Sequence, residues 1–155
     1  MIQVEIPGRQ DVKVEHLVLD YNGTVAKDGE LIDGVAERLL ELKELVDVHI
    51  LTADTYGTAR KQCEPLGVFV DTFPRANAAE CKVEIVRNLK ENRMCIGNGF
   101  NDVLMFDEAE FAVAVLEEEG TYAGLLSHAD VVTKGIVDAL DLLLKPNRLK
   151  ATLRT

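Results

Sequence analysis

The chain has 155 residues, of which 47% are hydrophobic, and this length suffices for one domain with a core of its own. Its 27 acidic and 17 basic residues give a formal net charge of −10, and it contains no Trp. Such a surface repels nucleic acid and offers few rings for base stacking, which argues against a nucleic-acid partner. No apolar run is long enough to cross a bilayer and no targeting segment is recognisable, so we expect a soluble, cytoplasmic protein with no membrane partner.

Patterns typical of strands and helices alternate along the chain. Short apolar runs predict strands at about residues 2–6, 17–20, 46–51, 68–70, 94–96, 111–115 and 131–132. Amphipathic spacing predicts helices near residues 35–45, 55–64, 78–91, 101–107 and 136–144. Because strands that alternate with helices form parallel sheets with right-handed crossovers, we expect one α/β domain over residues 1–155, a three-layer, Rossmann-like, doubly wound and mostly parallel sheet. Residues 1–14 would add an N-terminal strand extension and residues 145–155 a C-terminal tail.

The strand predicted at 17–20 ends in a carboxylate. The segment HLVLDYNGTV is apolar up to Asp20, then turns at Asn22 and Gly23 and is closed by Thr24. Open parallel sheets hold their ligands at the carboxyl ends of the strands, which is where a nucleophile belongs. The alternative is that Asp20 and Asn22 only satisfy the backbone of a turn.

Thr52 and Lys82 are the next candidates along the chain. Thr52 follows the strand predicted at 46–51, and Lys82 stands on the helix predicted at 78–91. Taken alone, Thr52 would be the N-cap of the following helix, and Lys82 would be a solvated side chain with no advantage over Lys61 or Lys90. Both residues therefore depend on their place in a larger pattern.

A glycine-bounded acidic loop, GNGFND, follows the strand predicted at 94–96. We expect positive φ angles at Gly97 and Gly99, which would let Asn98, Asn101 and Asp102 face a common site. A plain Asn-Gly turn is the alternative.

Taken in order, Asp20, Thr52, Lys82 and the loop 97–102 resemble the four motifs of the haloacid dehalogenase superfamily of phosphoryl-transfer enzymes. The resemblance covers about residues 15–144. Within the superfamily, the chain resembles a small group called soluble P-type ATPase-like proteins, after the phosphorylation domain of cation pumps. Four segments carry that resemblance: DYNGTVAKDG, LTADTYGT, GNGFNDVLMF and DALDLLLKPNRLKATLR.

The resemblance implies a phosphohydrolase or phosphotransferase that depends on Mg²⁺. Asp20 would attack phosphorus in line and form an aspartyl phosphate that water then cleaves, while Lys82 would neutralise charge on the phosphate and on Asp20. The residues implied as metal ligands are Asp20, Asn22 through its main-chain carbonyl, Asn98 and Asp102. The residues implied in phosphate binding are Thr52, Ala53, Gly23 and Lys82.

Two amides stand where the superfamily usually has carboxylates. Asn22 replaces the Asp that serves phosphatases as acid and base, and Asn98 replaces a carboxylate of the pump-like loop. Because an amide does not exchange a proton near neutral pH, loss of a positioned acid or base costs about 10²–10⁴-fold in rate. A substrate whose leaving group needs little protonation, such as an acyl or aryl phosphate, would fit Asn22, and so would a long-lived aspartyl phosphate.

The spacing of the motifs leaves no room for an inserted cap domain. Between Asp20 and Thr52 there is space only for a turn, a hairpin around Asp28 and Gly29, and one helix. The chain also lacks the nucleotide-binding domain that the pumps insert here, so ATP hydrolysis is not expected. Capless relatives act on large substrates or close the site with a neighbouring subunit, which leaves a homo-oligomer open. The expected substrate is a phosphorylated small molecule or an acyl phosphate.

Two other functions stay open. One is a catalytically slow or inactive regulatory protein that binds phosphate or a metal ion, and the other is a purely structural subunit. The three cysteines are odd in number and widely spaced, so they indicate no metal pattern and no redox role. The cations of the tail, which form either a solvated helix end or a contact for an anionic partner, are Lys145, Arg148, Lys150 and Arg154.

Overall fold

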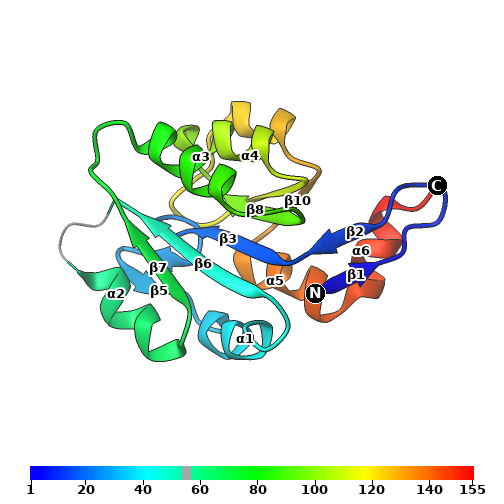
Figure 1. The fold of residues 1–155 in the computed structure, drawn as a ribbon, viewed down its shortest axis with the longest axis horizontal. Helices are drawn as coiled ribbons and strands as arrows, with labels where there is room; N and C mark the ends of the chain where they lie inside the picture. Colours follow the sequence, from blue (N-terminus) through cyan, green and yellow to red (C-terminus); the bar gives the residue numbers. More distant parts are fainter. Residues whose placement is uncertain (54–56) are drawn as a thin grey trace.

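The computed structural model describes residues 1–53 and 57–155, and its centre is a sheet of six parallel strands. The order across the sheet is β10-β9-β8-β3-β6-β7 (Figure 1). Its strands are β3 (His16–Asp20), β6 (Asp47–Thr52), β7 (Phe69–Thr72), β8 (Arg93–Gly97), β9 (Phe111–Val115) and β10 (Val131–Thr133). Strands that are covered on both faces are short apolar runs, and every residue of β9 is buried.

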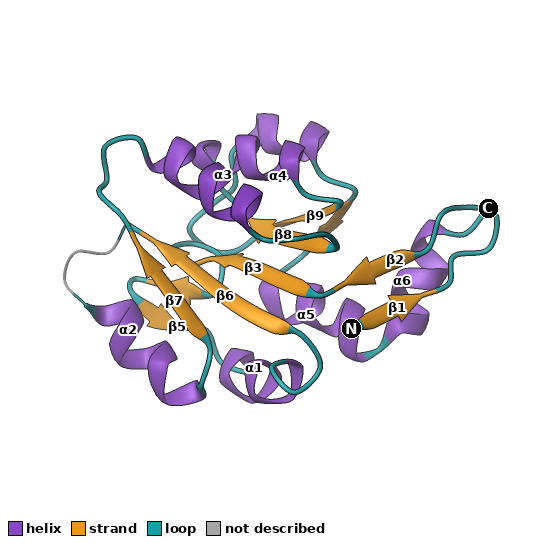
Figure 2. Cartoon of the chain, in the orientation of Figure 1, coloured by secondary structure: helices purple, strands orange, loops and turns teal. Residues whose placement is uncertain are grey.

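Helices cover both faces of this sheet (Figure 2). One face carries α1 (Val35–Leu42), α2 (Thr58–Cys63) and α5 (Ile136–Leu144), and the other carries α3 (Ala78–Asn88) and α4 (Val103–Glu108). Alternate residues of β3 enter different cores because side chains of a strand alternate in direction. Leu17 and Leu19 pack on the α1 and α5 side, and Val18 packs on the α3 and α4 side. This three-layer arrangement confirms the predicted fold class.

A two-stranded arm extends from the sheet. β1 (Ile2–Val4) pairs antiparallel with β2 (Val12–Val14), and α6 (Pro146–Leu153) packs against β1, so both ends of the chain lie in this arm (Figure 1). The sequence pattern predicted β1 but not β2, and the tail at 145–155 forms α6. The side chains of Lys145 and Arg148 are 55% and 52% exposed, and they also lie 3.6 and 3.5 Å from the carboxylate of Asp141.

Several predicted boundaries shift. The helix predicted at 55–64 begins outside the described residues, and α2 starts at Thr58. The helix predicted at 101–107 is a 3₁₀ turn, η2 (Phe100–Asp102), followed by α4. Two further 3₁₀ turns are η1 (Glu64–Leu66) and η3 (Ala123–His128).

The hairpin predicted around Asp28 and Gly29 is present as β4 (Ala26–Lys27) and β5 (Glu30–Leu31). Both turn residues have positive φ, 52° and 84°, as a tight hairpin turn requires. The described part of the chain contains no inserted cap domain. None of the helices within residues 1–53 and 57–155 is long and apolar enough to cross a membrane.

The register of the sheet decides which loops meet. β3 lies between β6 and β8, with Asp20 paired to Leu51 and Leu19 paired to Ile96. Because the three strands are parallel and in step, the loops that follow them emerge at the same edge. This edge is where open α/β sheets hold ligands.

Candidate active site

The loop after β3 holds Asp20 at the edge of the sheet. The carbonyl of Tyr21 accepts hydrogen bonds from the amides of residues 24–26 at 3.0–3.3 Å, and the amide of Gly23 donates to the carbonyl of Ala26 at 2.8 Å. Gly23 has a φ of +78°, which a residue with a side chain adopts only at a cost. The loop is therefore a closed turn built on its own backbone, and Asp20 at its base is only 7% exposed.

Lys82 lies between two carboxylates. From α3, its Nζ donates hydrogen bonds to Oδ1 of Asp20 at 2.8 Å, to Oδ1 of Asp102 at 2.7 Å and to Oδ1 of Asn101 at 2.8 Å. Lys82 is 2% exposed and Asp102 is fully buried. The structure thus brings Asp20, Lys82 and Asp102 together, whereas Lys61 and Lys90 are exposed.

The loop after β8 turns Asp102 back onto its own backbone. Oδ2 of Asp102 accepts hydrogen bonds from the amides of Asn98 at 3.1 Å and Gly99 at 2.9 Å. A Cβ atom at Gly97 would lie 2.4 Å from the same oxygen, so position 97 must be glycine for this approach. The expected positive φ angles at Gly97 and Gly99 are wrong, because neither residue has one. The close approach of the Asp102 carboxylate, and not a positive φ angle, explains why residue 97 is a glycine.

Thr24 links the two loops. Its hydroxyl lies 3.0 Å from Oδ2 of Asp20 and 3.1 Å from Oδ1 of Asn98, and it shares its single proton between these acceptors. The amide nitrogen of Asn98 donates to the carbonyl of Gly120 at 2.9 Å. The sequence analysis gave Thr24 no role in the site. The sequence feature that could have indicated such a role is the position of Thr24, four residues after Asp20.

The remaining candidates lie around this centre. Thr52 ends β6 one residue beyond the partner of Asp20, and it is buried. Asn22 is exposed, and with Ala53 it lines a cavity of about 290 Å³ that also includes Arg75. Asn101 is exposed, and its side-chain oxygen accepts a hydrogen bond from Lys82 at 2.8 Å. The exposed cation Arg75 was not among the residues that the sequence pattern indicated.

The charges of the cluster perturb each other. Burial raises the pKa of Asp20 from an ordinary 3.8 to about 6, and the charge of Asp102 adds to this rise, while Lys82 and the hydroxyl of Thr24 oppose it. Burial by itself would lower the pKa of Lys82, but the two carboxylates raise it above its ordinary value. The site thus places two carboxylates against one ammonium group.

The donor set of the cluster fits a hard divalent cation. Mg²⁺ prefers carboxylate, carbonyl and amide oxygens and keeps several waters. Oδ2 of Asp20 and Oδ1 of Asn98 both contact the hydroxyl of Thr24, so oxygen atoms that could act as metal ligands come together from two loops. The excess negative charge of the buried carboxylates favours such an ion.

No family model matches the chain. An uncharacterized protein of Methanocaldococcus jannaschii is 42% identical over 78 residues, which are 47% of this chain and 84% of that protein. A soluble P-type ATPase-like phosphatase of the same organism is 30% identical over 126 residues, which are 79% of this chain. The chain spans about half of that phosphatase, 46% of its length.

Solved structures with a similar fold include two phosphatases. The cobalt-bound deoxy-D-mannose-octulosonate 8-phosphate phosphatase of Haemophilus influenzae has a TM-score of 0.72 at 12% identity, over 93% of this chain and 95% of that chain. The 3-deoxy-D-manno-octulosonate 8-phosphate phosphatase of Moraxella catarrhalis, in complex with magnesium, phosphate and KDO, has a TM-score of 0.67 at 15% identity, over 90% of each chain. At these identities the likeness shows the fold.

Proposed function

We propose that this chain, which shares its fold with solved phosphatases, belongs to the haloacid dehalogenase superfamily and is a metal-dependent phosphohydrolase or phosphotransferase that acts through Asp20. The observation that carries this proposal is the buried contact between Asp20 and Lys82 at the ligand-binding edge of the sheet. A buried carboxylate with a pKa near 6 that is held beside an ammonium is a frequent feature of catalytic sites.

Asp20 is the nucleophile in this proposal. Lys82 binds Oδ1 at 2.8 Å, whereas Oδ2 accepts only the shared hydroxyl proton of Thr24 at 3.0 Å, so we assign Oδ2 as the attacking atom. A bond forms between Oδ2 and phosphorus, and the bond to the leaving oxygen breaks as that oxygen takes the electron pair. A water molecule then attacks phosphorus, the bond to Oδ2 breaks, and the carboxylate of Asp20 is restored. Because the pKa of Asp20 is about 6, the carboxylate is ionised and ready to attack at neutral pH.

The metal ion is proposed to bind between the loops after β3 and β8. Asp20, Asp102, the amide oxygen of Asn98 and the main-chain carbonyl of Asn22 would hold Mg²⁺ there. When bound, the ion would neutralise charge on the transferring phosphoryl group. Magnesium and cobalt in the two phosphatases of similar fold support a divalent ion. Thr52 and Ala53 would supply donors to the phosphate oxygens, and Lys82 would add a positive charge. The amide of Gly23 already donates to the carbonyl of Ala26, so Gly23 would shape the loop beside the phosphate and not bind it.

Asn22 restricts the leaving group. It is exposed and lines the cavity of about 290 Å³, and its amide can neither donate a proton to the leaving oxygen nor take one from water. We therefore propose acyl or aryl phosphates of small molecules as substrates, because their leaving groups depart without protonation. In the second step, hydrolysis of the aspartyl phosphate, the proton of the attacking water passes to solvent. We expect this step to be slow, because no positioned base takes that proton.

The test is phosphate release from acetyl phosphate and from an aryl phosphate, with Mg²⁺ and after chelation. Asp20→Asn should abolish metal-dependent release, because the amide cannot form the aspartyl phosphate. Asp33→Asn is the matched control, since Asp33 is an exposed carboxylate, and it should retain full activity. Release that survives Asp20→Asn would refute the proposal. Metal and phosphate binding without any release by the unaltered protein would support the regulatory alternative that Asn22 favours.

Asn22→Asp tests the account of the leaving group. A carboxyl group at this position restores a proton donor, and we expect release from an alkyl phosphate to rise by about 10²-fold or more. Release from an aryl phosphate should rise much less, because its leaving group needs little protonation. Equal gains for both substrates would contradict the role assigned to Asn22.

A further inference from the structure

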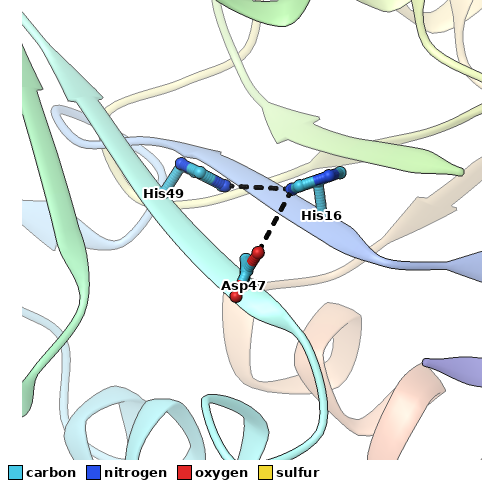
Figure 3. A group of neighbouring side chains, drawn as sticks. All are labelled: His16, Asp47 and His49. Carbon is cyan, nitrogen blue, oxygen red and sulfur yellow. Dashed lines mark hydrogen bonds and ion pairs between the residues drawn. The ribbon is translucent and has the colours of Figure 1, made fainter. Parts of the chain in front are cut away.

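Three metal-ligating side chains gather at the other end of β3 and β6. His16 is the first residue of β3, while Asp47 and His49 are the first and third residues of β6. The register pairs His16 with Asp47 and Val18 with His49. Paired residues and residues two apart project from the same face of a sheet, so all three side chains lie on one face, as Figure 3 shows. Asp20 lies four positions after His16 along β3, which is a distance of roughly 13 Å.

The spacing of the ligand atoms suits a metal ion. Nδ1 of His16 lies 3.3 Å from Nε2 of His49 and 3.7 Å from Oδ2 of Asp47, and the ligand atoms of the three residues lie within 4.8 Å of one another. In a tetrahedral zinc site, bonds of about 2.0–2.1 Å place neighbouring ligand atoms roughly 3.3–3.5 Å apart. Two of the separations therefore need only small adjustments.

The surroundings hold the histidines in place and leave one side open. His49 is 8% exposed, and its ring stacks on that of Phe69 with centroids 5.1 Å apart. The side chain of Asp47 is 60% exposed, which leaves room for a water ligand.

Neighbouring charges do not oppose a cation here. The nearest strand residue on β8 is Arg93, which is paired with His16 in register. Its guanidinium is already neutralised by Glu110 at 2.7 Å. On the other side, Asp71 of β7 adds a negative charge that acts on His49.

We propose that His16, Asp47 and His49 form a second metal site, for a divalent transition ion of the zinc and cobalt type. Two imidazoles and one carboxylate are ligands that such ions prefer to Mg²⁺, and a water molecule would complete the tetrahedron. The bound ion would join β3 to β6 at the end of the sheet opposite Asp20. A hydrogen bond between the imidazoles and an ion pair with Asp47 would give similar distances, and metal binding distinguishes the two arrangements.

The test is titration of the whole protein with Co²⁺ in the presence of excess Mg²⁺, which occupies oxygen sites. We expect one equivalent of Co²⁺ to bind with the visible absorption of a tetrahedral ion and without a thiolate band in the near ultraviolet. His16→Ala and His49→Ala should each weaken binding at least about 10-fold, since each removes one of three ligands. His128→Ala is the matched control, because His128 lies on η3 beside Asp107, and it should bind Co²⁺ normally.

Asp20→Asn should also retain the tetrahedral cobalt signal, which separates this site from the proposed catalytic one. Cobalt binding that is unchanged in both histidine variants, or that is lost equally in His128→Ala, would overturn the proposal.

A thermal measurement covers the case in which the buried His49 variant does not fold. With free Zn²⁺ at about 100 times its Kd, the Tm of the unaltered protein should rise by roughly 5–10 °C. Asp47→Asn, at an exposed position, should fold normally and show a much smaller rise. An unaltered Tm in the native protein, or the same rise in Asp47→Asn, would refute the site.

Discussion

Lys82→Met is the sharpest perturbation of the cluster that holds Asp20. Met has a similar length and apolar character but cannot donate the three hydrogen bonds that Lys82 makes at 2.7–2.8 Å. The substitution leaves Asp20 and Asp102 buried together without a counter-ion. We expect a folded but strongly destabilised protein.

The size of the expected loss in stability follows from the burial of Lys82 and its two carboxylate partners. Removing one partner of a buried ion pair typically costs about 3–5 kcal/mol. Even with Lys82 present, the rise in the pKa of Asp20 from 3.8 to about 6 corresponds to about 3 kcal/mol against the ionised form. Without Lys82 the pKa of Asp20 rises further, because burial and the charge of Asp102 are no longer opposed. Uptake of a proton by Asp20 then limits the loss.

The pH dependence has a definite sign. A carboxyl group with a raised pKa binds more protons in the native state than in the unfolded state between the two pKa values, so stability falls as pH rises through that window. The cost of Lys82→Met should therefore be about 3–5 kcal/mol near pH 8 and clearly smaller near pH 5, where Asp20 is protonated.

Urea unfolding followed by circular dichroism, without divalent metal, measures this cost at both pH values. Lys61→Met is the control, because Lys61 is exposed, and it should change stability by less than about 0.5 kcal/mol. A loss below about 1 kcal/mol for Lys82→Met near pH 8, or an equal loss at both pH values, would refute the reasoning.

Two further substitutions test the supporting structure. Gly97→Ala should reduce metal-dependent phosphate release by about 10²-fold, because its Cβ would lie 2.4 Å from Oδ2 of Asp102 and displace it. Gly99→Ala, whose Cβ would meet only ordinary contacts, should leave release nearly unchanged, and equal effects would contradict the close-approach argument. Asp141→Asn, which breaks an ion pair with Arg38 at 2.9 Å, should cost about 1–3 kcal/mol near neutral pH. Because Arg38 lowers the pKa of Asp141, the ion pair stabilises the protein fully at pH values above the ordinary pKa of an Asp, and this stabilisation is lost as pH falls through the lowered pKa. A difference in urea unfolding that does not depend on pH would count against this argument.

The sequence predicted which residues lie at the ligand-binding edge of the sheet better than it predicted the contacts that these residues make. An apolar run that ends in Asp20 is enough to place this carboxylate at the carboxyl end of a strand. Choosing Lys82 over Lys61 and Lys90 needed the order of motifs, because helical periodicity is compatible with all three. The structure shows the physical difference, since only Lys82 is buried between carboxylates.

Features that depend on register were beyond the sequence. His16 and His49 are 33 residues apart, and they meet only because β3 and β6 pair with Asp47 opposite His16. The role of Gly97 was missed for a similar reason, since the pattern suggested a turn with positive φ and not the close approach of a carboxylate. The short strand β2 has only three residues, too few for a periodicity to stand out.

The most direct test of the proposed chemistry is a search for the phosphoryl group on Asp20. The protein would be mixed with acetyl phosphate and Mg²⁺, quenched in acid within the first turnover, digested and analysed by mass spectrometry. The account predicts a phosphoryl group on the peptide that contains Asp20, absent without metal and absent in Asp20→Asn. Phosphate release with no covalent intermediate at any quench time, or with the phosphoryl group on another residue, would contradict it.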